Sequence, residues 1–376
     1  GAMVVGHAHP KIVEAIQRQA ELGTHFAQPT KHLDVIGENL TERFRLPLWR
    51  FCNSGTEATL EAARLMRANT GRDVLIKIEG TYHGHHDSLM FSVAPEPEDM
   101  GPREHPATVA QALGIPQAFA DLVVVVPFND LEAARKAFEE HEGRVAGMLV
   151  EPAMMNCGVI LPEPGYLQGL KDLCHANGAY LAFDEVKTGA TLSFGGAVEA
   201  FGVVPDIVCL AKAIGGGTPC GAIGATTDLY RPVIDGDYDM AGTFNGNPLT
   251  MAASKAALLD VLVPDAYEQF DRIDKAMKDG LTAVIEETGL PAYVSGVGAK
   301  GSVIYSDRPV REYRDVVVID ERISYLAWLF QQNRGVFKSP WTKQETWTLS
   351  VWHTEDDAAR YVANFEEFAK SVTGVA

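Results

Sequence analysis

The sequence predicts an α/β protein in which helices flank a mainly parallel sheet, followed by a smaller α+β region. Short apolar runs rich in β-branched residues alternate with helical segments from about residue 46 to residue 262. Such alternation specifies a parallel sheet with right-handed crossovers. Beyond residue 263 a long amphipathic helix and short strand-like segments replace this alternation. We therefore expect an N-terminal segment (1–45), a large domain (46–262) and a small α+β domain (263–376).

Two helices are expected before the first strand. After His9-Pro10, apolar residues recur at helical spacing from Ile12, and a second helix covers 33–44. The segment 46–51 reads as a strand and runs into Asn53-Ser54-Gly55-Thr56-Glu57-Ala58, ahead of an alanine-rich helix to about residue 68. Ser54 or Thr56 can cap that helix, and a helix start attracts anions. The turn is therefore either a simple cap or a phosphate site.

The strand 74–78 leads into a turn that carries Tyr82 and several histidines. His83, His85, His86 and Asp87 suggest a metal, but they lack i, i+4 spacing and a distant partner cluster, so we predict no metal site. Tyr82 is instead placed to lie flat on an aromatic ligand, with His83 supporting it or touching a substrate. A core tyrosine beside solvent-exposed histidines is the alternative.

The middle of the chain resumes the alternation after an irregular stretch. Residues 94–120 are rich in Pro, Glu and Gly, a composition typical of lids and binding loops. Strands are then expected at 122–126, 147–150 and 179–184, and helices at 131–141 and 166–177. Glu151 follows the second of these strands, where it is either a site residue or a capped carboxylate.

The stretch from Ala179 to Gly217 holds two apolar runs, each ending on a charge, at Asp184 and at Lys212. Ligands of open α/β sheets bind outside the carboxyl ends of strands, so both side chains should face one crevice. They form either a structural ion pair or a site in which Asp184 faces a ligand cation and Lys212 is a reactive amine. Pyridoxal phosphate meets both demands, because its ring nitrogen needs an anion and its aldehyde forms a Schiff base with lysine.

The remaining elements complete the two domains. A strand is expected at 221–226 and a helix at 249–262, separated by the turn Ala241-Gly242-Thr243-Phe244-Asn245-Gly246-Asn247-Pro248, which by itself reads as an ordinary loop. In the small domain we expect a helix from 265 to 288, strands near 294, at 302–305, 335–338 and 347–351, and helices at 323–333 and 354–371.

Composition excludes several classes of partner. The net charge of −18 comes from 32 basic and 50 acidic residues and argues against nucleic acid or an anionic membrane as a partner. No apolar run is long enough to span a membrane, and the first residues do not resemble a signal peptide. The five cysteines form no Cys-x-x-Cys pair and indicate a reducing, cytoplasmic location.

Seven motifs in order resemble the class III, fold-type-I aminotransferases that use pyridoxal 5'-phosphate, with a pattern close to glutamate-1-semialdehyde 2,1-aminomutase and related transaminases. They are Gly-His-Ala-His-Pro, Asn-Ser-Gly-Thr-Glu-Ala, Tyr-His-Gly, Val-Glu-Pro, Asp-Glu-Val, Lys-Ala-Ile-Gly-Gly-Gly and Gly-Thr-Phe-Asn-Gly-Asn-Pro. The resemblance covers nearly the whole chain. It implies a seven-stranded-type sheet in the large domain and a further N-terminal segment before residue 1.

The resemblance also implies roles for individual residues. Lys212 would be the Schiff-base lysine and Asp184 the partner of the ring nitrogen, so these two are the catalytic residues. The other cofactor-binding residues would enclose the ring or hold the phosphate: Tyr82, His83 and Val186 at the ring, and Ser54, Gly55 and Thr56 at the phosphate. Thr243 would reach the phosphate of a neighbouring subunit, which implies a homodimer with active sites at its interface.

Two segments depart from the family pattern and affect the expected substrate. The run from Lys187 to Leu192 lacks the usual aromatic residue and arginine, and 338–345 is longer and more polar than in the mutase. We therefore expect an aminotransferase that moves an amino group from an amine, β-amino acid or amino acid to a keto or aldehyde acceptor by ping-pong kinetics. The alternatives are an intramolecular aminomutase or racemase on the same scaffold, and a non-catalytic binding protein.

Overall fold

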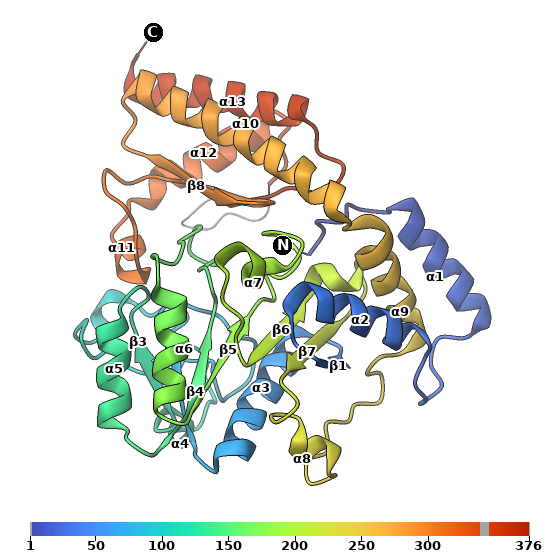
Figure 1. Ribbon diagram of the computed structural model, residues 1–376. Coiled ribbons are helices and arrows are strands. Elements are labelled where there is room, and N and C mark those ends of the chain that lie inside the picture. Colours follow the sequence, from blue (N-terminus) through green and yellow to red (C-terminus); the bar gives the residue numbers. More distant parts are fainter. Residues whose placement is uncertain (1, 339–345, 376) are drawn as a thin grey trace.

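The centre of the molecule is a seven-stranded sheet, seen in a computed structural model that describes residues 2–338 and 346–375 (Figure 1). The strand order is β1-β7-β6-β5-β4-β2-β3. The strands are β1 (Leu48–Cys52), β2 (Val74–Ile78), β3 (Val123–Val126), β4 (Val145–Val150), β5 (Tyr180–Asp184), β6 (Ile207–Ala211) and β7 (Gly221–Ala225). The five from β3 to β6 pair in parallel, whereas β7 is antiparallel to β6 and to β1. The predicted mainly parallel sheet is confirmed.

Both faces of this sheet are covered by helices. Residues of β4 and β5 alternate between two apolar clusters: Met148 and Phe183 belong to one, and Leu149 and Ala182 to the other. Helix α3 (Gly55–Thr70) contributes to the second cluster, and α5 (Leu131–Glu140) and α6 (Tyr166–Ala176) to the first. Because the strands are buried on both sides, they read as unbroken apolar runs in the sequence.

The remaining helices of this part surround the sheet and its connections. Helices α1 (Pro10–Leu22) and α2 (His32–Phe44) pack against α9 (Pro248–Lys255). The short elements are η1 (Pro97–Asp99), α4 (Gln117–Ala120), α7 (Gly196–Phe201), η2 (Lys212–Gly215), α8 (Arg231–Ile234) and the π-helical turn η3 (Ala256–Val261). The expected helix over 249–262 is thus α9 continued by a π-helical turn. Among the described residues, no helix is long and apolar enough to cross a membrane.

A second layer of structure follows residue 263. Its three-stranded antiparallel sheet has the order β10-β9-β8, with β8 (Tyr293–Val297), β9 (Lys300–Ile304) and β10 (Thr346–Thr348). Its helices are α10 (Pro264–Thr288), α11 (Tyr313–Val317), α12 (Glu321–Asn333) and α13 (Glu355–Thr373). Helices α10 and α13 lie side by side across the top of Figure 1. The two sheets fall on opposite sides of the predicted boundary at 262/263, which stays a prediction.

An ion pair between Arg314 and the buried Glu79 connects the part of the chain after residue 263 to the main sheet. Arg314 of α11 donates from Nε and Nη2 to the two carboxylate oxygens of Glu79, at 2.8 and 3.0 Å. The same guanidinium donates to the backbone carbonyls of Met100 and Gly101, both at 2.9 Å. Glu79 follows β2 directly, so the contact spans more than 200 residues of sequence.

The strand predicted at 335–338 is wrong. Gly335 takes a positive φ of 81°, and the Val336 N–H donates back to the carbonyl of Gln331. This turn follows the end of α12 at Asn333. In the part of the chain that the structure describes, residues 336–338 belong to no strand. The nearby strand β10 is shorter than expected, with three residues, and most of the long polar segment singled out in the sequence, 339–345, lies outside the described residues.

Candidate active site

Asp184 and Lys212 lie at the ends of the neighbouring parallel strands β5 and β6 and line one cavity of about 500 Å³. Asp184 is buried and Lys212 is half-buried. A volume of this size is typical of a site for a small cofactor. The structure thus places an acid and an amine in a common enclosed space, the arrangement that the two charge-terminated runs suggested.

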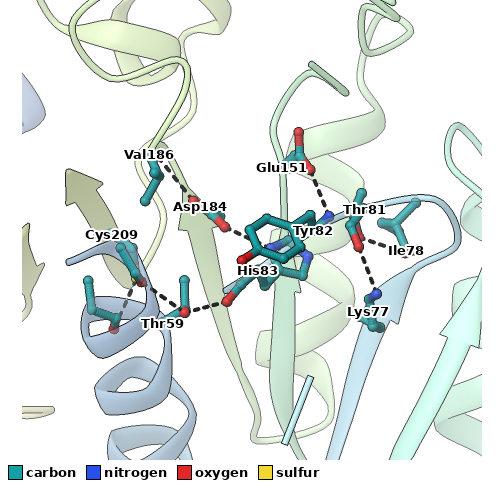
Figure 2. Close-up of polar contacts among 12 residues, drawn as sticks. Thr59, Lys77, Ile78, Thr81, Tyr82, His83, Glu151, Asp184, Val186 and Cys209 are labelled. Atoms are coloured by element: carbon teal, nitrogen blue, oxygen red, sulfur yellow. Dashed lines mark hydrogen bonds and ion pairs between the residues drawn. The ribbon is translucent and has the colours of Figure 1, made fainter. Parts of the chain in front are cut away.

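The Asp184 carboxylate is held in position on both of its oxygens. Oδ1 accepts the Val186 N–H at 3.0 Å, and Oδ2 lies 2.8 Å from Nδ1 of His83 (Figure 2). A carboxylate only accepts hydrogen bonds, so Nδ1 must carry the proton. The other ring nitrogen of His83, Nε2, is buried without a hydrogen-bond partner among the described residues. His83 therefore orients the acid, a contact that the sequence did not predict.

Two charged side chains, those of Lys77 and Glu151, hold the loop that carries Tyr82 and His83 by hydrogen bonds to its backbone. The Lys77 ammonium lies inside the main sheet and donates to the carbonyls of Thr81, at 2.8 Å, and of Phe91. Burial lowers the pKa of Lys77 to about 7. Glu151, at the end of β4, accepts the Tyr82 N–H at 3.1 Å. Tyr82 is 37% exposed and lines the cavity.

The start of α3 forms another wall of this cavity. Ser54 is the N-cap, and its hydroxyl accepts the Glu57 N–H at 3.2 Å and donates to the Glu57 carboxylate at 3.1 Å. The first N–H groups of a helix have no acceptor within the helix, so those of Gly55 and Thr56 are available to an anion. A Cβ on Gly84 would lie 2.7 Å from the Thr56 Cα, so only glycine permits this close approach. The turn is thus both a cap and a candidate phosphate site.

Lys212 occupies an unusual backbone conformation. It is the first residue of η2, directly after β6, and its φ is +53°, in the left-handed region that residues other than glycine seldom adopt. Strain of this kind concentrates at functional sites. Burial lowers the pKa of the Lys212 amine, an effect that the nearby carboxylate of Asp184 opposes. A larger share of the amine is therefore neutral, and so able to accept a proton, than for a lysine in water.

Thr243 is separate from these residues within one chain. It is exposed in the 241–247 loop and lines a different cavity, of about 1050 Å³, together with His25 and residues 27–29. The loop is nevertheless tied to the start of α3, because Nδ2 of Asn53 donates to Oδ1 of Asn245 at 2.7 Å. The structure therefore brings together every predicted site residue except Thr243.

The histidine-rich turn has other contacts. His85 is exposed, whereas Nε2 of His86 lies 3.3 Å from the Thr59 hydroxyl. In the part of the chain that the structure describes, no three His, Cys, Asp or Glu side chains are grouped to hold a metal ion.

A second cavity, of about 890 Å³, adjoins the first and was not predicted. Ala2, Met3, Asn156 and Lys187 line both, and the larger cavity extends beneath the small antiparallel sheet to Lys300. The sequence marked Lys187 only as a departure from the family pattern. Lys300 carried no signal, because a lysine in a short strand usually faces solvent.

The residues around the smaller cavity fit pyridoxal phosphate. They offer an amine, a fixed carboxylate, a helix start with free N–H groups and an aromatic ring, and the buried Nε2 of His83 has no hydrogen-bond partner among the described residues. Glu151 also lines this cavity, where its carboxylate accepts the N–H of Met155 at 3.0 Å and Nδ2 of Asn156 at 2.7 Å. Glu151 thus shapes the wall on which Tyr82 lies.

Comparison with known proteins agrees with this site. The family model described as Aminotransferase class-III matches residues 1–356. Glutamate-1-semialdehyde 2,1-aminomutase 2 of Exiguobacterium sibiricum is 38% identical over 368 residues, which cover 97% of this chain and 82% of that protein. An omega-transaminase from Sphaerobacter thermophilus has a similar structure, with a TM-score of 0.91 at 33% identity over 98% of this chain and 84% of that one.

A glutamate-1-semialdehyde-aminomutase from Pseudomonas aeruginosa, solved as a variant in complex with PMP, gives a TM-score of 0.87 at 27% identity over 98% of this chain and 81% of that one. The residues of the smaller cavity and these similarities lead to one conclusion. The chain belongs to the class III aminotransferases and is an enzyme that depends on pyridoxal phosphate.

Proposed function

We propose that this enzyme is an intermolecular aminotransferase that moves an amino group from an amine, β-amino acid or amino acid to a separate keto or aldehyde acceptor. The observation that favours transfer between two molecules is the cavity of about 890 Å³ beside the cofactor cavity. Such a volume accommodates substrates of different size and shape in turn, as ping-pong kinetics require. An intramolecular reaction needs room for one small substrate only.

Each residue of the cofactor cavity has a proposed task. When bound, pyridoxal phosphate supplies a carbonyl carbon that accepts an amino group and a protonated ring that withdraws electrons from the substrate's α-carbon. Asp184 keeps the proton on the ring nitrogen, and His83 and the Val186 N–H hold the carboxylate in place for this. Tyr82 and Val186, which both line the cavity, would hold the ring between them. Ser54, Gly55 and Thr56 bind the phosphate at the start of α3.

Lys212 would hold the cofactor through its side-chain amine, and as a free amine it would move a proton to and from the substrate's α-carbon. The lowered pKa of its amine suits this task, because a neutral amine is the form that accepts a proton. Replacing Lys212 by alanine should lower turnover by a factor on the order of 10²–10⁴ and abolish the absorbance of the covalently held cofactor. Transamination retained at the wild-type rate in Lys212→Ala would refute the assignment.

An intramolecular aminomutase is the second candidate, because a curated aminomutase is 38% identical to this chain. The two reactions differ in what they need. A mutase converts a single substrate without an acceptor, whereas an aminotransferase forms keto product beyond one equivalent per active site only when an acceptor is supplied. Product analysis of the purified holoenzyme with glutamate-1-semialdehyde alone, and with an amine donor with and without pyruvate, separates them.

We also propose that two copies of the chain form a homodimer in which Thr243 completes the partner's phosphate site. Supporting this, Thr243 is exposed next to Phe244, whose side chain is also exposed, and its loop contacts the start of α3 through Asn245. Mixing Lys212→Ala with Thr243→Ala subunits should restore activity, because one site of each mixed dimer then has both wild-type residues. If Thr243 acts within its own chain, mixing restores nothing.

A further inference from the structure

The larger cavity carries a charge opposite to that of the protein as a whole. The chain has a net charge of −18, yet the basic groups that line this cavity are Lys187, Lys300, Lys338 and Arg360 and its acidic lining among the described residues is Asp357. Asp357 is already engaged, since its carboxylate accepts the N–H and the hydroxyl of Thr354 at the start of α13. A local excess of positive charge inside an acidic protein concentrates anions there.

Two of these lysines have incomplete sets of partners. Nζ of Lys187 donates to the Met155 carbonyl at 2.9 Å, and Nζ of Lys300 donates to the Thr348 hydroxyl at 2.6 Å. An ammonium group has three hydrogens to donate. Within residues 2–338 and 346–375, neither lysine forms an ion pair. Lys300 is only 5% exposed, so its charge is buried, and no described carboxylate lies in contact with it.

A buried ammonium of this kind is unfavourable unless an anion joins it. Burial lowers the pKa of Lys300 to about 7, and the positive charges of Lys187 and Lys212 act in the same direction. Burial also lowers the pKa of Lys187. An anionic group between the two would restore the lost interactions, since hydrogen bonds between charged groups are among the strongest in proteins.

The positions of Lys187 and Lys300 indicate that the anionic group belongs to the substrate. Lys187 lies three residues after Asp184 and lines both cavities, so it stands where the larger cavity opens onto the cofactor site. Lys300 lies only in the larger cavity, on β9 opposite Thr348 of β10. A substrate whose amine reaches Lys212 therefore extends past Lys187 towards Lys300.

We propose that the larger cavity is an anion subsite in which Lys187 and Lys300 bind a carboxylate of the substrate at a distance from the reacting amine. This inference rests on the proposed function and narrows it to donors and acceptors that carry such a carboxylate. Lys187 and Lys300 are specificity-determining residues in this proposal, because they contact the non-reacting end of the substrate.

The test measures binding to the holoenzyme, in which the cofactor already fills the phosphate site. Malonate, succinate, glutarate and adipate are titrated calorimetrically into the wild type, with glutaramide as the uncharged counterpart. We expect at least one diacid to bind saturably, glutaramide to bind at least tenfold more weakly, and both Lys300→Met and Lys187→Gln to weaken diacid binding at least tenfold. Lys300→Arg should retain most of the affinity, and Lys275→Met, at an exposed lysine of α10, should retain all of it.

Wild-type affinity in Lys300→Met and in Lys187→Gln, equal binding of glutaramide, or no saturable diacid binding would each overturn the subsite. Kinetics separate this failure from failure of the proposed function. Transamination of carboxylated and carboxylate-free donors with equal kcat/KM, unchanged by Lys300→Met, removes the subsite and keeps the aminotransferase. Lysine-dependent diacid binding in an enzyme that needs no acceptor keeps the subsite and removes the aminotransferase.

Discussion

Replacing Lys300 by methionine should stabilise the protein near neutral pH, and the gain should shrink as the pH rises. Methionine keeps a long unbranched chain in the cavity and removes the buried ammonium, whose one hydrogen bond among the described residues is to the Thr348 hydroxyl, at 2.6 Å. The pKa of Lys300 is lowered from 10.5 to about 7 by burial and by the charges of Lys187 and Lys212. Between these two values the unfolded chain binds a proton that the folded chain does not.

The magnitude follows from this difference in bound protons. In that window the free energy of unfolding of the wild type rises with pH at about 1.4 kcal/mol per unit through this one group. From about pH 7.5 to about pH 9.5, allowing for partial titration at both ends, the rise amounts to roughly 2.5 kcal/mol. Lys300→Met lacks this contribution, so its advantage over the wild type should shrink by the same amount.

Urea unfolding of the cofactor-free protein at the two pH values, followed by tryptophan fluorescence, measures the effect. Lys275→Met serves as the control. The Lys275 side chain is 76% exposed, so its replacement should change the free energy of unfolding by the same amount at both pH values. If the difference in free energy of unfolding between Lys300→Met and the wild type is the same at both pH values, the lowered pKa of the buried Lys300 is refuted.

Three further predictions concern other contacts of the site and the fold. Arg314→Met should lower the free energy of unfolding by about 3–5 kcal/mol, measured in urea, because it leaves the Glu79 carboxylate buried without its partner. Asp184→Asn should keep bound cofactor visible in the absorbance spectrum but lower kcat by a factor on the order of 10², because an amide does not hold the ring proton. Gly84→Ala should weaken cofactor binding about tenfold in an equilibrium titration, because its Cβ would lie 2.7 Å from the Thr56 Cα. Unchanged values would contradict each one.

The sequence predicted the main sheet well because its strands are buried on both faces. Continuous apolar runs such as Val145–Val150 have no other stable location, and each ends near a change to polar residues. The expected strand at 335–338 failed for the opposite reason. Its residues are apolar enough for a strand, but strand formation needs a partner, and Gly335 instead turns the chain away after α12. Pairing partners are set by tertiary structure, which local pattern does not contain.

The candidate site likewise contains residues that the local sequence pattern predicts and contacts that only the tertiary structure determines. Asp184 and Lys212 were predictable because each ends a strand and the ends of parallel strands share one edge. The hydrogen bond from His83 to Asp184 joins residues 101 positions apart, and nothing in the Tyr-His-Gly motif states which nitrogen faces the acid. Lys300 was not predictable, because its burial arises only when the small sheet covers the larger cavity.

The hydrogen bond between Asn53 and Asn245 has a thermodynamic consequence for a dimer of the proposed kind. It joins the segment that presents Thr243 outward to the residue just before the N-cap of α3. Ordering either end restricts the other, and coupling between two binding events acts equally in both directions. Dilution that separates the subunits should then release cofactor, and stripping the cofactor should loosen the subunits by the same factor. The fraction of enzyme that retains cofactor would thus depend on the enzyme concentration, because cofactor binding and subunit association are coupled.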